Sequence, residues 1–285
     1  MPLCSRLNID ISVSLKAAYV GNILNIFTNR SIYSTIKKVS KAALYGSRRL
    51  IVTNKADSLI DFRIVTPIRE TSDSFFCTVP DAIDELRCGR MIIVVDDEKR
   101  ENEGDFVIPA ESVNPDTINF MARYGRGLIC VSMKGERLDA LDIGRLPSNY
   151  SGGVGTAFAM PVDARLGTST GISAEDRCKT VKALIDPKSI PSDFLYPGHL
   201  FPLRYREGGV MTRQGHTEAS IDLSELSGFF PAAVICEIMN DDGSMARVKD
   251  LKQVALDHDL KILSIERLVE YIRVTQSRVV GSPAV

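Results

Sequence analysis

Short apolar runs recur through the last two thirds of the chain, and they predict strands that are buried on both faces. Runs of about four to eight apolar residues are typical of the inner strands of a sheet. The predicted strands cover Met91–Val95, Phe106–Pro109, Gly127–Met133, Gly155–Val162, Ala232–Met239 and Lys261–Ile265. Residues 186–202, which include four prolines, are predicted to form a loop.

Amphipathic spacing and capping residues predict helices between these strands. Asn114 is a favoured N-cap residue with a proline behind it, and Ser173 with Asp176 has the pattern of a capping box. Gly89 and Gly228 follow two of the helices, where a left-handed cap is common. The helices are expected at Pro80–Cys88, Pro115–Gly125, Ser173–Ile185, the later part of Arg213–Leu223, Asp250–His258 and Glu266–Thr275.

The order of these elements sets the expected fold class. Strands and helices intermix, and no repeat with a period of about 20–50 residues is visible. We therefore expect one compact α/β (mixed α+β) domain over residues 78–285, with a central mixed β-sheet flanked by helices. An apolar fraction of 44% in 285 residues is enough for one sizeable core.

The first 77 residues differ in composition from this body. Residues 1–55 carry nine lysines and arginines against Asp10 alone, a charge of +8, which leaves −9 for the rest of a chain whose net charge is −1. Such a leader is typical of an organelle transit peptide, of plastid or mitochondrion. The alternatives are an ordinary extension or a wrongly joined upstream frame, and without a targeting signal we expect a cytoplasmic protein. No fixed structure is expected in residues 1–77, and 56–77 would be a linker.

Composition argues against several functional classes. No stretch approaches about 18 uninterrupted apolar residues, so we expect no transmembrane helix and no membrane partner. The acidic body argues against nucleic-acid binding and suits a domain that collects metal ions. None of the six cysteines forms a C-x-x-C pair, so we expect a reducing compartment and no zinc site.

The strongest chemical signal is the segment 96–105, with the sequence DDEKRENEGD. Six of its ten residues are carboxylates, and they follow a predicted buried strand, where open α/β sheets place their sites. Carboxylates at this density repel one another unless solvent, Lys99 and Arg100, or a hard cation such as Mg2+ offsets their charge. A solvated acidic turn is the alternative, although Gly104 would allow a tight turn that aims several acids inward.

Three further segments carry candidate groups. Arg213-Gln214-Gly215-His216-Thr217-Glu218 precedes a predicted helix, whose N-terminus with a nearby arginine suits an anion, while His216 could bind metal or transfer protons. His199 lies in the proline-rich stretch and could be catalytic or merely packed. Glu237 is an acid inside an apolar run, a candidate for proton transfer with an exposed sheet edge as the alternative. His258 is expected at a solvated helix end.

Taken together, these motifs resemble the 3,4-dihydroxy-2-butanone 4-phosphate synthase family. The similarity covers about residues 78–275, and four motifs occur in the family's order. The motifs are Asp96–Asp105 (DDEKRENEGD), Pro197–Leu203 (PGHLFPL), Arg213–Asp222 (RQGHTEASID) and Cys236–Arg247 (CEIMNDDGSMAR). The resemblance implies a carbon–carbon lyase of riboflavin biosynthesis that converts D-ribulose 5-phosphate to L-3,4-dihydroxy-2-butanone 4-phosphate and formate. It also implies a homodimer and a requirement for Mg2+, with Mn2+ as an alternative.

The resemblance assigns roles to particular residues. Glu101 and His216 match metal ligands, and Glu237 and His199 match positions essential to catalysis. A base, Asp105 or Glu237, would remove a sugar proton to give an enediol. The substrate-binding positions matched are Arg100, Glu101, Asp105, Arg213, Gln214, Gly215, His216, Thr217 and Glu237. Gln214 stands where a smaller residue is common in the family, and Ser148–Val154 receives no role.

Two other functions stay open from the sequence. A metal-dependent isomerase or aldolase acting on a pentose phosphate would share the enediol step, and formate release would distinguish it. A non-catalytic scaffold would be expected to lose acids or histidines from the four motifs, and none is lost. Many relatives carry a fused GTP cyclohydrolase II domain, and because the chain stops at Val285 we expect a single function.

Overall fold

The computed structural model describes residues 49–54, 60–65, 75–147 and 155–280, so most of the leader and the segment Ser148–Val154 lie outside the described residues. The chain divides into two units, Met1–Asp73 and Ser74–Val285. In the first unit, β1 (Arg49–Asn54) pairs antiparallel with β2 (Ile60–Val65), a local pairing in a leader where we expected none.

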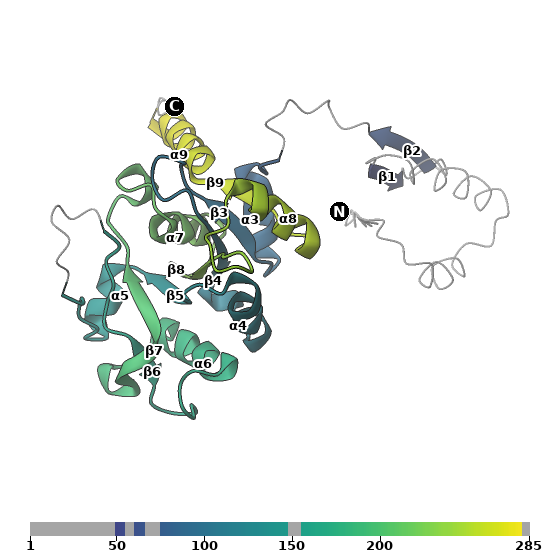
Figure 1. The fold of residues 1–285 in the computed structure, drawn as a ribbon. Coiled ribbons are helices and arrows are strands. Elements are labelled where there is room, and N and C mark those ends of the chain that lie inside the picture. Colours follow the sequence, from purple (N-terminus) through teal and green to yellow (C-terminus); the bar gives the residue numbers. More distant parts are fainter. Residues whose placement is uncertain (1–48, 55–59, 66–74, 148–154, 281–285) are drawn as a thin grey trace. The chain divides into compact units, whose positions relative to one another are not determined.

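A seven-stranded mixed sheet forms the centre of the second unit, as predicted (Figure 1). The strand order is β6-β7-β5-β8-β4-β3-β9. The β3–β9 and β5–β7 pairs are parallel, and the other neighbours are antiparallel. The strands are β3 (Ile92–Val95), β4 (Gly104–Pro109), β5 (Cys130–Met133), β6 (Val162–Ala164), β7 (Phe194–Arg204), β8 (Ala232–Glu237) and β9 (Ile262–Ser264).

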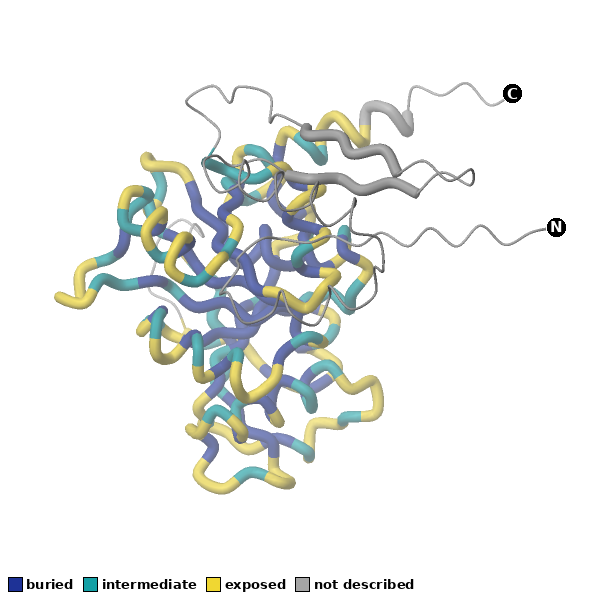
Figure 2. Tube along the Cα trace, turned by 90° about the vertical axis from the view of Figure 1, so that its right-hand side faces the viewer, coloured by how far each residue is buried: buried dark blue, intermediate teal, exposed yellow. Residues whose placement is uncertain are grey.

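Helices cover both faces of this sheet, and each face has its own apolar core. Along β3, Ile92 and Val94 pack in one core while Ile93 and Val95 pack in the other, because successive strand residues point to opposite faces. The helices over the first core are α3 (Val79–Arg87), α7 (His216–Leu226) and α9 (Ile265–Val280). Those over the second are α4 (Pro115–Phe120), α5 (Gly135–Ala140), α6 (Ala174–Ile185) and α8 (Val248–His258). In Figure 2 the buried segments, in dark blue, run through the middle of the unit, and the exposed segments lie mostly at its edges.

Local capping chemistry fixes the helix starts that the sequence predicted. The Asn114 side chain accepts the Thr117 N–H at 3.0 Å, and the Ser173 hydroxyl accepts the Asp176 N–H at 3.0 Å. Thr78 and Asp81 form a further capping box that begins α3. Gly89 and Gly228 adopt the left-handed backbone expected of helix ends, with φ of 71° and 83°.

Several sequence predictions are wrong in detail. The loop expected over residues 186–202 contains most of β7, because this segment pairs with β5 on one side and β6 on the other. Residues 155–162 contribute only isolated bridges at Phe158 and Ala159 before β6 begins. The helix expected to reach Gly125 is α-helical to Phe120 and continues as a π-turn over Met121–Gly125. Short 3-10 turns occur at Ala110–Ser112, Pro191–Asp193 and Gly209–Met211.

The described residues contain no helix that is both long and apolar enough to cross a bilayer.

Candidate active site

The acidic segment folds around Asp96, which follows the last residue of β3 and whose side chain is fully buried. Its Oδ2 accepts the Glu101 N–H at 3.0 Å, and its Oδ1 accepts the Glu103 N–H at 2.9 Å. Arg100 adds an ion pair at 2.8 Å and contacts Glu101 at 2.6 Å. The Asp96 carboxylate thus stabilises the turn, and the half-exposed Glu101 carboxylate lies at the surface of the site.

Strand register places two of the predicted acids opposite each other. Asp105 on β4 is the direct partner of Glu237 on β8. Directly opposed side chains in an antiparallel pair lie about 4.5–5.5 Å apart at Cβ, and like charges there repel. The Leu128 N–H donates to Glu237 Oε2 at 2.8 Å, which offsets part of that repulsion. Gly127 is required beside this bond, because a Cβ there would lie 2.6 Å from the same oxygen.

Asp105 has the electrostatic character of a proton-transfer group. Burial raises its pKa well above the usual range, and the negative charges of Glu237, Glu103, Glu101 and Asp96 act in the same direction. Its Oδ1 is buried and has no hydrogen-bond partner among the described residues. An unpaired buried oxygen of this kind is costly, so a ligand or substrate group is expected to satisfy it.

His216 is the first residue of α7, and its ring points into the same cluster. Nδ1 lies 3.9 Å from Glu101 Oε2, and Nε2 lies 3.9 Å from Asp105 Oδ1. Burial lowers the pKa of this imidazole, and Asp96 and Glu101 act against that effect. The neutral ring is the form that binds metals, and Nε2 has no partner among the described residues.

These residues suit a divalent cation. Donor atoms of Asp96, Glu101 and His216 all lie within 4.8 Å of one another. Two carboxylates, one neutral imidazole and room for substrate oxygens and water form an oxygen-rich donor set of the kind that hard cations prefer. Since both Asp96 oxygens already accept backbone N–H groups, Glu101 and His216 are the donors free to change partners.

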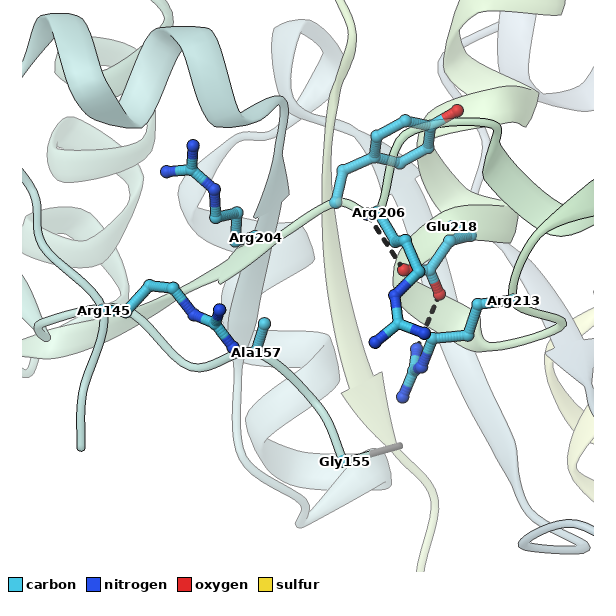
Figure 3. Close-up of a pocket in the computed structure, with 8 residues that line it drawn as sticks. Arg145, Gly155, Ala157, Arg204, Arg206, Arg213 and Glu218 are labelled. Atoms are coloured by element: carbon cyan, nitrogen blue, oxygen red, sulfur yellow. Dashed lines mark hydrogen bonds and ion pairs between the residues drawn. The ribbon is translucent and has the colours of Figure 1, made fainter. Parts of the chain in front are cut away.

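An arginine-rich pocket of about 190 Å³ lies beside the start of α7 (Figure 3). Glu218, only 1% exposed, pairs with Arg213 at 2.6 Å and accepts the Arg206 N–H at 3.2 Å. Figure 3 shows Arg145 and Arg204 on one side of the pocket and Arg213 on the other. The lining residues are Arg145, Gly155, Ala157, Arg204, Tyr205, Arg206, Arg213 and Glu218. Arg213 is paired with Glu218 and Arg204 with Asp139, so the four arginines leave a net positive charge at the pocket, which predicts an anionic ligand.

Sequence reasoning singled out Arg213 but missed the other three arginines of this pocket. Arg204 is the last residue of β7, and Arg206 follows it two residues later. Arg145 comes from a distant part of the chain, and no local pattern connects it to Arg213.

The rest of the arginine–histidine motif lies around the helix start. Gly215 is the N-cap residue of α7 and Thr217, 4% exposed, is in its first turn. A Cβ at Gly215 would lie 2.3 Å from an Arg213 nitrogen, so only glycine fits without a shift. Gln214 is exposed, whereas Gly215 and Thr217 are buried.

His199 is held apart from the acid cluster. It lies on β7, and β5 and β8 separate that strand from β4. Three strand spacings correspond to roughly 14 Å. Its ring nitrogen Nδ1 lies 2.7 Å from Asp163 Oδ2. His258, predicted at a solvated helix end, instead packs its ring against Phe120 and Tyr124 with centroids 4.9 and 4.3 Å away.

Comparison with known proteins assigns the sequence to a family. The sequence profile of 3,4-dihydroxy-2-butanone 4-phosphate synthase matches residues 80–271. The chain belongs to the 3,4-dihydroxy-2-butanone 4-phosphate synthase family. The four motifs identified in the sequence all lie within the matched residues 80–271.

Individual relatives agree with the family assignment. Riboflavin biosynthesis protein RibBA of Aquifex aeolicus is 54% identical over 204 residues, which cover 71% of this chain and 50% of that protein. The 3,4-dihydroxy-2-butanone 4-phosphate synthase of Agrobacterium fabrum is 51% identical over 68% of this chain and 92% of its own length. The chloroplastic monofunctional protein RIBA 2 of Arabidopsis thaliana is 50% identical over 70% of this chain and 42% of its own. This chain thus spans about half the length of several curated relatives.

A solved structure has the same fold. The synthase described as a complex with two magnesium ions is 39% identical to this chain, with a TM-score of 0.66. The match covers 70% of this chain and 99% of the solved one. The family match at residues 80–271 lies within the second unit, Ser74–Val285.

Proposed function

We propose that this chain converts D-ribulose 5-phosphate to L-3,4-dihydroxy-2-butanone 4-phosphate and formate, as a carbon–carbon lyase of riboflavin biosynthesis. The observation that carries the proposal is the opposed Asp105–Glu237 pair beside the Glu101–His216 donors. Proton removal next to a sugar carbonyl needs a base and positive charge close together, and the cluster supplies the base while it has the donors for a cation.

Asp105 would move the proton. Its raised pKa makes it a stronger base than an ordinary aspartate once ionised, and its Oδ1 is unpartnered. Glu237 lies across the strand pair, with Oε2 held by the Leu128 N–H, so it would stay in place while Asp105 changes charge. Arg100, which is held by Asp96 and Glu101, would contact a sugar oxygen at the rim of the site.

Glu101 and His216 would hold Mg2+, with Mn2+ as an alternative. When bound, the cation would supply positive charge beside the sugar oxygens that become negative during the reaction. The donor distances and the unpartnered His216 Nε2 support this assignment.

The arginine pocket would bind the phosphate group of the substrate. Arg213 lines the pocket and lies shortly before α7 begins at His216, and the N-terminal N–H groups of a helix favour an anion. Gln214 and Gly215 would shape the turn between them.

The Arg145→Gln variant is expected to raise the KM for ribulose 5-phosphate about three- to tenfold with kcat nearly unchanged, because an exposed guanidinium adds uniform attraction for the phosphate. Steady-state formate release measures both constants, and the KM difference should shrink at high salt. Arg90→Gln, an exposed arginine before β3, is the matched control and should behave as the parent. An unchanged KM in Arg145→Gln would remove this arginine from the phosphate site.

A homodimer would account for the position of His199. The family resemblance places this histidine among the catalytic groups, yet in one chain it lies roughly three strand spacings, about 14 Å, from Asp105. A second copy could bring its own His199 to the cluster, and we propose that the site forms at such a contact. Sedimentation of the purified protein would show the dimer, and a stable monomer with full activity would exclude it.

We also propose that the basic leader targets the protein to an organelle, with the plastid favoured by the plant relatives named chloroplastic. A fusion of residues 1–77 to a fluorescent protein is expected to enter plastids in plant cells. The same fusion with the nine lysines and arginines of residues 1–55 replaced by glutamine is the control and should stay in the cytosol. Cytosolic fluorescence from both fusions would contradict the proposal.

The test of the reaction uses the full chain with ribulose 5-phosphate and either Mg2+ or EDTA. Formate is expected with Mg2+ and not with EDTA. Folded protein that releases no formate with metal would contradict the proposal, and NMR of the sugar would then reveal whether the chain isomerises its substrate instead.

A further inference from the structure

The β6–β7 pairing is interrupted at Asp163. Val162 pairs with Leu200, while the next residue, Asp163, pairs with Leu195. Residues 196–199 of β7 therefore have no partners on β6, and they form a bulge between two paired positions. Bulges re-aim side chains beside functional sites. The last residue of this one is His199.

Both oxygens of the Asp163 carboxylate hold His199. Oδ1 accepts the His199 backbone N–H at 2.9 Å, and Oδ2 lies 2.7 Å from the ring nitrogen Nδ1. The Asp163 side chain is 11% exposed, whereas that of His199 is 44% exposed. One nearly buried carboxylate thus fixes both the backbone and the ring orientation of a histidine that faces outward.

Two glycines make this contact sterically feasible. A Cβ at Gly198 would lie 2.0 Å from the backbone of Val162, and one at Gly171 would lie 2.1 Å from Asp163 Oδ2 and 2.6 Å from His199 Nδ1. Gly171 also has a φ of 90°, which other residues rarely adopt. The chain is therefore closely packed around this one hydrogen bond.

We propose that Asp163 is a positioning residue that keeps His199 as the Nδ1–H tautomer, with Nε2 as the nitrogen that exchanges protons in the reaction. The inference rests on the proposed function, in which His199 is catalytic. A carboxylate accepts only, so a neutral imidazole beside it must place its proton on Nδ1, which leaves the Nε2 lone pair free. Asparagine would place an NH2 donor near Nδ1 and favour the opposite tautomer, the kind of change that lowers kcat in catalytic triads.

The test measures the tautomer and the kinetics in the full chain. The protein has three histidines, so 15N-histidine labelling gives few signals, and loss of one set in His199→Asn assigns it. We expect the neutral His199 ring of the wild type to carry its proton on Nδ1. In Asp163→Asn the proton should move to Nε2, and kcat for formate release should fall about 100-fold while KM stays within about twofold.

Two further variants distinguish a specific effect of Asp163 on the His199 ring from a general disruption of the local structure. Asp163→Glu should restore the Nδ1–H signal and part of kcat. Asp176→Asn is the matched control, because Asp176 is also nearly buried and holds the neighbouring Ser169 and Gly171 N–H groups. It should keep the His199 tautomer and kcat.

An Nε2–H tautomer in the wild type, an undiminished kcat in Asp163→Asn, or the same tautomer change in Asp176→Asn would overturn the proposal. A wild-type chain that released no formate would contradict the proposed function instead, and the tautomer signals would still decide whether Asp163 positions the ring.

Discussion

The Glu101→Gln variant is expected to fold normally, to bind Mg2+ at least tenfold more weakly, and to release formate about a thousandfold more slowly than the parent. Glu101 and His216 supply the donors of the proposed metal site, and an amide oxygen carries no charge to attract a cation. The Glu101 side chain is 46% exposed, so losing its pairing with Arg100 should change the free energy of unfolding by no more than about 1 kcal/mol. Isothermal titration with Mg2+, formate release and thermal melting measure the three quantities.

Glu98→Gln is the matched control for this variant. Glu98 lies in the same acidic turn and is exposed, and it has no role in the proposed site. The same loss of one negative charge from the turn should leave Mg2+ affinity and turnover nearly unchanged. Equal effects in the two variants would mean that the turn attracts cations only through its total charge, and full turnover in Glu101→Gln would remove Glu101 from the metal site.

The local parts of this fold could be predicted from the sequence because their causes are local. Asn114 and Ser173 begin helices through hydrogen bonds that span only three residues. The apolar run Ile92–Val95 forms a strand because both of its faces are covered. The residues of β7 were predicted to be a loop on account of their prolines, and long-range pairing with β5 and β6 overrode that preference.

The same distinction applies to the site. Asp105 and Glu237 could each be named from the sequence, but their opposition depends on the register between β4 and β8, which no local pattern reveals. Glu237 was suspected because it is an acid in an apolar run, and the burial of Asp105 emerged only once both cores were in place. Arg145 joins Arg213 in one pocket only through the fold. The sequence therefore identifies which residue types can carry the chemistry, whereas their arrangement in space depends on the fold.

The Asp105→Asn variant is expected to lose at least a thousandfold in turnover while gaining stability at neutral pH. Asparagine cannot accept the proton, and a positioned general base is worth about 10²–10⁴ in rate. Asp105 is an acid that the folded state disfavours in its ionised form, since burial and four neighbouring carboxylates raise its pKa. Removing that charge should therefore raise the free energy of unfolding by about 1–2 kcal/mol at neutral pH, a common outcome when a functional carboxylate is replaced.

The pH dependence of that gain has a definite sign. The folded protein holds the Asp105 proton more tightly than the unfolded chain does, so the parent loses stability as pH rises from about 4, the ordinary aspartate value, toward the raised folded pKa. The Asp105→Asn variant lacks this loss. The difference in the free energy of unfolding between variant and parent should therefore vanish below about pH 4 and grow above it. Asp176→Asn should behave oppositely, because hydrogen bonds from Ser169 lower the Asp176 pKa to about 2 and its carboxylate stabilises the fold only above the ordinary value. Urea unfolding in EDTA at several pH values measures both trends, and a destabilised Asp105→Asn at neutral pH would mean that this carboxylate holds the site together.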